Sequence, residues 1–86
     1  MHADRELWQG ELVSFLRTIQ KPNKPVESVA VSDSLVASGL IDSLAVVQIV
    51  LYLENTYGID FASRGFDPEQ LASMASILDL IEETRA

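Results

Sequence analysis

The 86-residue sequence has room for one small domain with a single core, since 48% of its residues are hydrophobic. It has no cysteine, which excludes disulfides, thiolate metal sites and a cysteine nucleophile. Its formal net charge of -7 argues against nucleic-acid binding and favours basic protein partners. No apolar run could span a bilayer and no signal peptide is evident, so we expect a cytoplasmic protein without a membrane span.

The residues that most enzymes use are missing or poorly placed. The only histidine is His2, beside the terminus, where nothing would hold it against a serine. No pair of acidic residues has a convincing setting for metal or glycosidase chemistry, and no glycine-rich phosphate loop is present. We therefore expect a protein that is not an enzyme, with no catalytic residue and no metal site.

Hydrophobic periodicity predicts a first helix at about residues 4–20, because apolar residues recur at spacings of three and four. Pro22 and Pro25 prevent its continuation. The segment from about residue 21 to 41 is predicted to be a long ordered loop. Five apolar residues should hold this loop against the helices: Val29, Val31, Leu35, Val36 and Leu40.

A second helix is predicted over residues 42–57, with Asp42 as its N-cap and Gly58 just beyond its end. Ser43 would occupy the first helical position, at an exposed corner where the helix end favours a phosphate ester. The sequence also assigns faces to this helix. The core face would hold Val46, Ile49, Val50, Leu53 and Tyr57, and the solvent-exposed stripe would hold Ala45, Gln48, Tyr52 and Asn55.

A further apolar row, Leu44, Val47 and Leu51, lies beside that exposed stripe. A helix packed on one side only does not need such a row. Either another element of the chain covers it or a partner protein does.

The carboxyl-terminal part predicts two more helices. Asp67 and Pro68 are typical of a helix start and indicate a short third helix at about residues 67–72. Ser73 would cap a fourth helix at about residues 74–84. The expected fold is all-α: a four-helix bundle with a long loop between its first two helices and a short third helix.

Residues 33–44 (DSLVASGLIDSL) resemble the attachment motif of acyl carrier proteins, the phosphopantetheine-binding carrier family, and the resemblance extends from about Asp4 to Glu83. It implies that a phosphopantetheinyl transferase attaches 4'-phosphopantetheine from coenzyme A to Ser43, with assistance from Asp42 toward the transferase or its magnesium. The arm's thiol would carry an acyl or aminoacyl group, which a cysteine-free chain cannot otherwise hold as a thioester.

The resemblance also implies partners and a role. A ligase would load the acyl or aminoacyl group, and acyl-transferring enzymes of lipid, cell-envelope or secondary-metabolite biosynthesis would receive it. Leu44, Val47 and Leu51 match docking positions of such carriers, and we add Glu54, the only acidic residue between Ser43 and Tyr57. We expect a monomer.

Ala45 and Gln48 stand where carriers of bacterial fatty acid synthesis usually have carboxylates. The pairs Val47-Gln48 and Phe66-Asp67 and the segment Tyr57-Gly58-Ile59-Asp60 are closer to D-alanyl carrier proteins and other stand-alone carriers. Met1 and the end at Arg85-Ala86 favour a stand-alone carrier over a domain of a modular synthase. The alternative from another class is a small helical interaction module that carries no cofactor.

Overall fold

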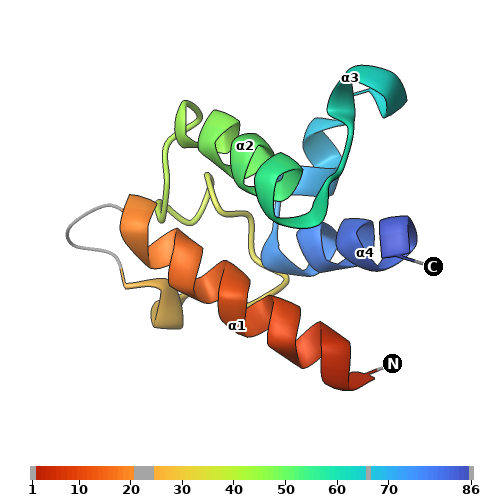
Figure 1. Ribbon diagram of the computed structural model, residues 1–86. Coiled ribbons are helices and arrows are strands. Elements are labelled where there is room, and N and C mark those ends of the chain that lie inside the picture. The colour runs from red at the N-terminus through yellow and green to blue at the C-terminus, as the bar shows by residue number, and fades with distance from the viewer. Residues whose placement is uncertain (1, 21–24, 66, 86) are drawn as a thin grey trace.

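The computed structural model describes residues 2–20, 25–65 and 67–85, and within these ranges the chain is helical, without a strand. The predicted all-α class is therefore confirmed. In the described part, the α-helices are α1 (His2–Ile19), α2 (Ala45–Tyr57), α3 (Phe61–Arg64) and α4 (Met74–Arg85) (Figure 1). Two 3-10 helices lie in the connections, η1 (Val26–Ser28) and η2 (Pro68–Leu71).

Helices α1 and α4 occupy one half of the molecule and α2 crosses the other, with α3 beyond the carboxyl end of α2 (Figure 1). Arg5 ties α1 to α4, because its guanidinium lies 2.9 Å from Asp79 Oδ1 and 2.8 Å from Glu82 Oε2. The start of α1 and the end of α4 lie on the same side of this view. The turn that leads into α2 lies on the opposite side.

The hydrophobic core draws on every long helix and on the loop between α1 and α2. Burying one leucine or isoleucine side chain contributes about 1.5–3 kcal/mol, so each member of this core is a substantial part of the stability of the fold. Its fully buried members are Leu12, Leu16, Leu35, Leu40, Ile41, Ile49, Leu53, Leu71, Ile77, Leu78, Leu80 and Ile81.

The loop between α1 and α2 is held to the carboxyl-terminal part by backbone hydrogen bonds. Leu35 N–H donates to the Ala72 carbonyl at 2.8 Å, and Ala75 N–H donates to the Val31 carbonyl at 2.8 Å. Val29, Leu35 and Leu40 are buried, as predicted. Val31 and Val36 are 40% and 44% exposed, so the prediction that they pin the loop was wrong. At Val31 the backbone carbonyl makes the attachment instead.

Of the residues predicted on the exposed stripe of α2, Ala45 is buried and Tyr52 is half-buried. Ala45 is 8% exposed. The Tyr52 ring stacks on Phe15 of α1, with ring centroids 4.3 Å apart. Tyr57 packs edge-on against Tyr52 at 5.9 Å, and its hydroxyl donates to Glu11 Oε1 of α1 at 2.8 Å. These aromatic contacts join α2 to α1, so the exposed side of α2 is narrower than predicted.

The segment after α2 differs in detail from the prediction. Gly58 ends α2 in the left-handed conformation, with φ 68°. Residues 61–64, where the sequence predicted no helix, form α3, which begins where Asp60 Oδ1 accepts Ser63 N–H at 3.2 Å. The helix expected at 67–72 is the 3-10 helix η2, in which Asp67 Oδ1 accepts Glu69 N–H at 3.0 Å. A 3-10 helix is wound more tightly than an α-helix and usually occurs in short segments such as η2.

The Tyr57 hydroxyl makes the stability of the fold sensitive to alkaline pH. Burial raises the pKa of Tyr57, and the negative charge of Glu11 contributes to the increase. Because the folded-state pKa lies above the unfolded value of about 10, this stabilisation is complete below pH of about 10 and is lost as the pH rises further.

We expect Tyr57→Phe to lose less unfolding free energy than the wild type between pH of about 9 and 11.5, since phenylalanine cannot ionise. Urea unfolding followed by circular dichroism across this range measures the difference. Parallel loss of stability in the two proteins would show that the Tyr57 hydroxyl does not control the alkaline transition.

Candidate functional site: the turn before helix α2

The chain reaches the start of α2 through two buried residues. Leu40 and Ile41 are 0% and 1% exposed, and Ile41 N–H donates to the Leu35 carbonyl at 3.3 Å. Just before them Gly39 turns the chain with φ 87°, a conformation that favours glycine. Because these residues are anchored in the core, the next three emerge together at the surface.

The prediction that Asp42 is the N-cap residue of α2 was wrong, because the helix begins later than expected and Leu44 holds that position. The Asp42 side chain nevertheless binds the start of the helix. Its Oδ1 accepts the Ala45 N–H at 3.0 Å, and its carbonyl oxygen lies 3.1 Å from the same nitrogen. This double interaction makes Ala45 the first helical residue. Ser43, predicted at the first helical position, therefore lies in the turn before the helix.

The Ser43 side chain is exposed, and its hydroxyl makes no hydrogen bond to any residue that the structure describes. The backbone N–H groups of Ser43 and Leu44 likewise have no partner among those residues. Free N–H groups at a helix start carry partial positive charge and bind phosphate oxygens. The turn thus presents a free nucleophilic oxygen beside two donors that suit a phosphate group.

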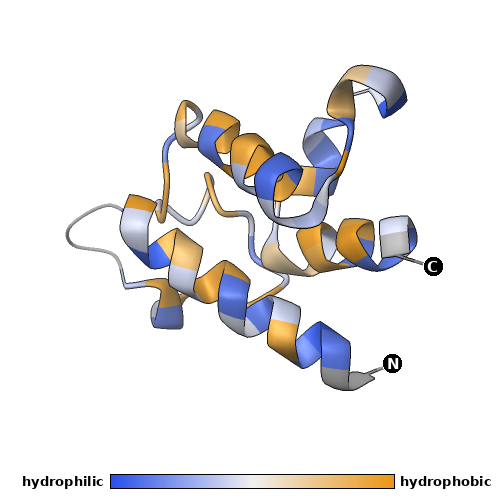
Figure 2. Cartoon of the chain, viewed as in Figure 1, coloured by the Kyte–Doolittle hydropathy of each residue, from blue (hydrophilic) through white to orange (hydrophobic). Residues whose placement is uncertain are grey.

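An apolar face extends from this turn along α2. We use that name for Leu44, Val47 and Leu51, whose exposed fractions are 79%, 60% and 51%. The predicted third row is therefore uncovered in the structure. Figure 2 shows that hydrophobic residues predominate along α2, whereas hydrophilic residues are frequent on α1.

The cations whose side chains the structure places are paired away from this face. Arg17 on α1 donates to Glu27 Oε1, with an Nε distance of 2.8 Å, and this interaction lowers the pKa of Glu27. Arg64 Nη2 lies 2.8 Å from Glu83 Oε1. Arg5 is bound to α4, as described above. Consequently none of these three arginines offers a positive charge to a group on Ser43.

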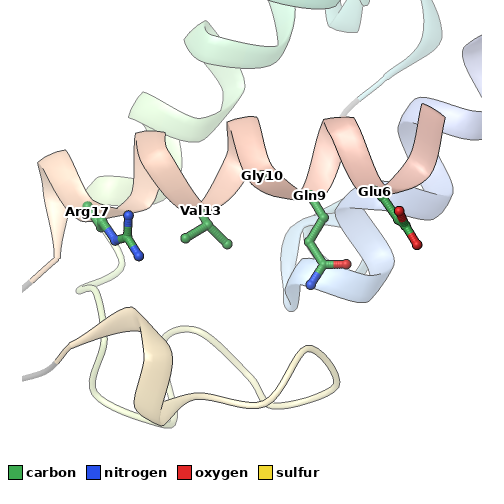
Figure 3. Close-up of a pocket in the computed structure, with 5 residues that line it drawn as sticks. All are labelled: Glu6, Gln9, Gly10, Val13 and Arg17. Atoms are coloured by element: carbon green, nitrogen blue, oxygen red, sulfur yellow. The ribbon is translucent and has the colours of Figure 1, made fainter. Parts of the chain in front are cut away.

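A shallow pocket elsewhere has no role in this site. Its lining residues all belong to α1 and face the connection that contains η1 (Figure 3): Glu6, Gln9, Gly10, Val13 and Arg17. The only cation that lines it is Arg17, which binds Glu27.

In the described ranges, no group of three or more acidic or histidine side chains could hold a metal ion. None of the helices described is both long and apolar enough to cross a membrane.

The structure brings together most of the residues that the sequence analysis singled out. Asp42, Ser43 and Leu44 are consecutive and exposed, and Val47 and Leu51 continue from them. Glu54 is half-buried near the far end of α2. The two free backbone N–H groups agree with the prediction that this helix start favours a phosphate ester. The prediction missed that they belong to the turn before α2 and not to its first helical residues.

A comparison with protein families identifies the family of the chain. The family model described as "phosphopantetheine attachment site" matches residues 15–82, which is more than half of the chain. No curated protein and no solved structure gives a significant match. The match covers the turn, all of α2 and most of the core, and a free hydroxyl beside phosphate-binding donors fits the arm that this family carries. The chain therefore belongs to the phosphopantetheine-attachment family of non-catalytic carrier proteins.

Proposed function

We propose that Ser43 is the attachment residue and that the protein presents an acyl or aminoacyl group to partner enzymes of lipid, cell-envelope or secondary-metabolite biosynthesis. The single observation that supports Ser43 is its exposed hydroxyl, free of hydrogen bonds, beside two unpaired backbone N–H groups. When bound, the arm supplies a terminal thiol that can hold such a group as a thioester.

The chain's own residues serve this role by position. Leu40 and Ile41 fix the turn in the core, so the Ser43 oxygen is held at the surface where a transferase can reach it. The N–H groups of Ser43 and Leu44 would bind the phosphate oxygens after attachment. As an acceptor of the arm, the protein itself needs no catalytic side chain.

Asp42 has a second oxygen available for the transferase. Oδ1 is used by the Ala45 N–H, whereas Oδ2 makes no hydrogen bond to a described residue. We propose that this free oxygen helps to hold the transferase or its magnesium during attachment. One oxygen of the Asp42 carboxylate would then bind the Ala45 N–H, and the other would bind the transferase or its magnesium.

The apolar face is the proposed docking surface for the transferase, the loading ligase and the acyl-transferring enzymes, with Glu54 at its far end. Leu44 follows the attachment residue directly, so an enzyme bound there lies next to the arm. We further propose that the protein acts as a cytoplasmic monomer. Its likeness to D-alanyl carrier proteins favours a stand-alone carrier that is loaded by a dedicated ligase. A cofactor-free interaction module fits the apolar face but gives no role to the family match.

Attachment can be tested directly in vitro. Purified apo protein is incubated with coenzyme A, magnesium and a promiscuous phosphopantetheinyl transferase, and its intact mass is measured. We expect a gain of one phosphopantetheinyl group per chain, located by peptide mapping to Ser43. Absence of the gain, or its location on another residue, would contradict the proposal.

Asp42 variants separate its two roles. Asp42→Asn keeps an oxygen that can accept the Ala45 N–H but loses the charge, whereas Asp42→Ala loses both. We expect Asp42→Asn to keep the helix content of the wild type and to lower kcat/KM for attachment at least about tenfold, which corresponds to about 1.4 kcal/mol. Wild-type kcat/KM in Asp42→Asn would reduce the role of Asp42 to capping.

A further inference from the structure

The loop that leads to the Ser43 turn folds back on itself at Ser38. The half-buried Ser38 hydroxyl donates to the Leu35 carbonyl at 3.1 Å and accepts the Leu40 N–H at 3.4 Å. The Leu35 carbonyl also accepts the Ile41 N–H at 3.3 Å. Between them Gly39, with φ 87°, bends the chain. One side-chain oxygen therefore joins the two ends of this bend.

The Leu40 N–H depends on the Ser38 hydroxyl. Leu40 is 0% exposed, and its N–H makes no other hydrogen bond to a described residue. A buried N–H without a partner is costly, so loss of the hydroxyl favours conformations in which this N–H reaches water. Such conformations displace Leu40 and Ile41, the two residues that anchor the Ser43 turn in the core.

The start of the bend is fixed to the carboxyl-terminal part of the chain. Leu35 is fully buried, and its N–H donates at 2.8 Å to the carbonyl of Ala72, between η2 and α4. Because Leu35 is held in this way, the Ser38 hydrogen bonds fix the position of Leu40 relative to the core. The position of the Ser43 turn follows, since Ser43 is only three residues beyond Leu40.

We propose that Ser38 is a positioning residue for arm attachment, because its hydroxyl holds the turn so that the Ser43 oxygen can reach the phosphorus of coenzyme A. In that step the Ser43 oxygen bonds to the phosphorus that bears the pantetheine. The pyrophosphate bond breaks, adenosine bisphosphate leaves, and the hydroxyl proton passes to a base of the transferase. A misplacement of about 1 Å can slow such a reaction about a hundredfold. This inference rests on the proposed function.

The test measures steady-state attachment by a promiscuous phosphopantetheinyl transferase, with the carrier concentration varied. Ser38→Ala should lower kcat at least about fivefold and keep KM within about twofold, because complexes form but fewer have the Ser43 oxygen aligned. Ser38→Thr keeps a hydroxyl and should restore kcat to within about twofold of the wild type. Hydrogen exchange measured by NMR should be faster at the Leu40 N–H in Ser38→Ala and not in Ser38→Thr.

The matched control is Ser34→Ala, in the same loop. Ser34 Oγ accepts the Ala37 N–H at 3.1 Å and makes no printed contact with residues 40 or 41. This variant should keep the wild-type kcat whether or not its melting temperature falls, at a temperature where circular dichroism shows every variant folded. Wild-type kcat in Ser38→Ala, no recovery in Ser38→Thr, or an equal loss in Ser34→Ala would overturn the inference while attachment to Ser43 still stands. A wild-type chain that gains no arm would instead contradict the proposed function.

Discussion

Truncating Leu53 to alanine is expected to lower the free energy of unfolding by about 2–5 kcal/mol, because the lost methyl groups leave a cavity in the core. Leu53 is 0% exposed, in the second half of α2, and belongs to the core shared with Leu12, Ile49 and Ile77. The total stability of a domain is about 5–15 kcal/mol, so one such change removes a large part of it. Urea or thermal unfolding followed by circular dichroism measures the loss.

The same helix provides a matched control. Leu51→Ala makes the same chemical change two residues earlier, at a side chain that is 51% exposed. Substitutions at such surface positions usually change stability by less than about 0.5 kcal/mol. Equal losses for Leu51→Ala and Leu53→Ala would mean that the core and exposed sides of α2 have been assigned wrongly.

Replacing Ser43 by alanine is expected to abolish arm attachment completely while leaving the melting temperature unchanged. The hydroxyl is the proposed acceptor, so no residual reaction should remain. It is also exposed and forms no hydrogen bond to a described residue, so the fold does not depend on it. Intact mass after incubation with transferase and coenzyme A, together with thermal unfolding, tests both parts.

Ser32→Ala is the control for this substitution. Ser32 is likewise exposed and unbonded within the described residues, and it lies in the loop before the motif. The Ser32→Ala protein should still accept the arm on Ser43 and reach the wild-type mass.

In cells, we expect Ser43→Ala to lose function, whereas a cofactor-free interaction module would keep its function after this substitution. A folded Ser43→Ala protein that still gains the arm would contradict the assignment.

The sequence predicted the exposed and buried sides of α2 well where the apolar pattern was unambiguous. Ile49 and Leu53 are fully buried, and Leu44, Val47 and Leu51 are exposed as one row. A spacing of three and four residues determines such faces without tertiary information.

The prediction failed where tertiary contacts decide the outcome. Tyr52 was placed on the exposed stripe because it lines up with Gln48 and Asn55 along the helix, but its ring stacks on Phe15 of another helix. The side chain of Ala45 is so small that its residue type does not indicate whether it lies on the buried or the exposed side of the helix. Periodicity along one helix does not show where a neighbouring helix lies, so these residues could be assigned only from the structure.

The turn itself was predicted only in part. Ser43 is exposed, as expected, whereas Leu44 and not Asp42 is the N-cap residue. The delay of the helix to Ala45 depends on both the side chain and the carbonyl of Asp42 converging on one N–H group. That local choice leaves the Ser43 and Leu44 N–H groups free, and residue types alone do not reveal it.

The central claim is that Ser43 holds a phosphopantetheine arm which carries an acyl or aminoacyl group. The most direct test is the intact mass of the protein isolated from its native cell, followed by peptide mapping. We predict a mass above that of the unmodified chain by one arm, with a further acyl or aminoacyl increment in part of the sample, both located on Ser43. A chain that is unmodified under every growth condition in which it is expressed would contradict the claim.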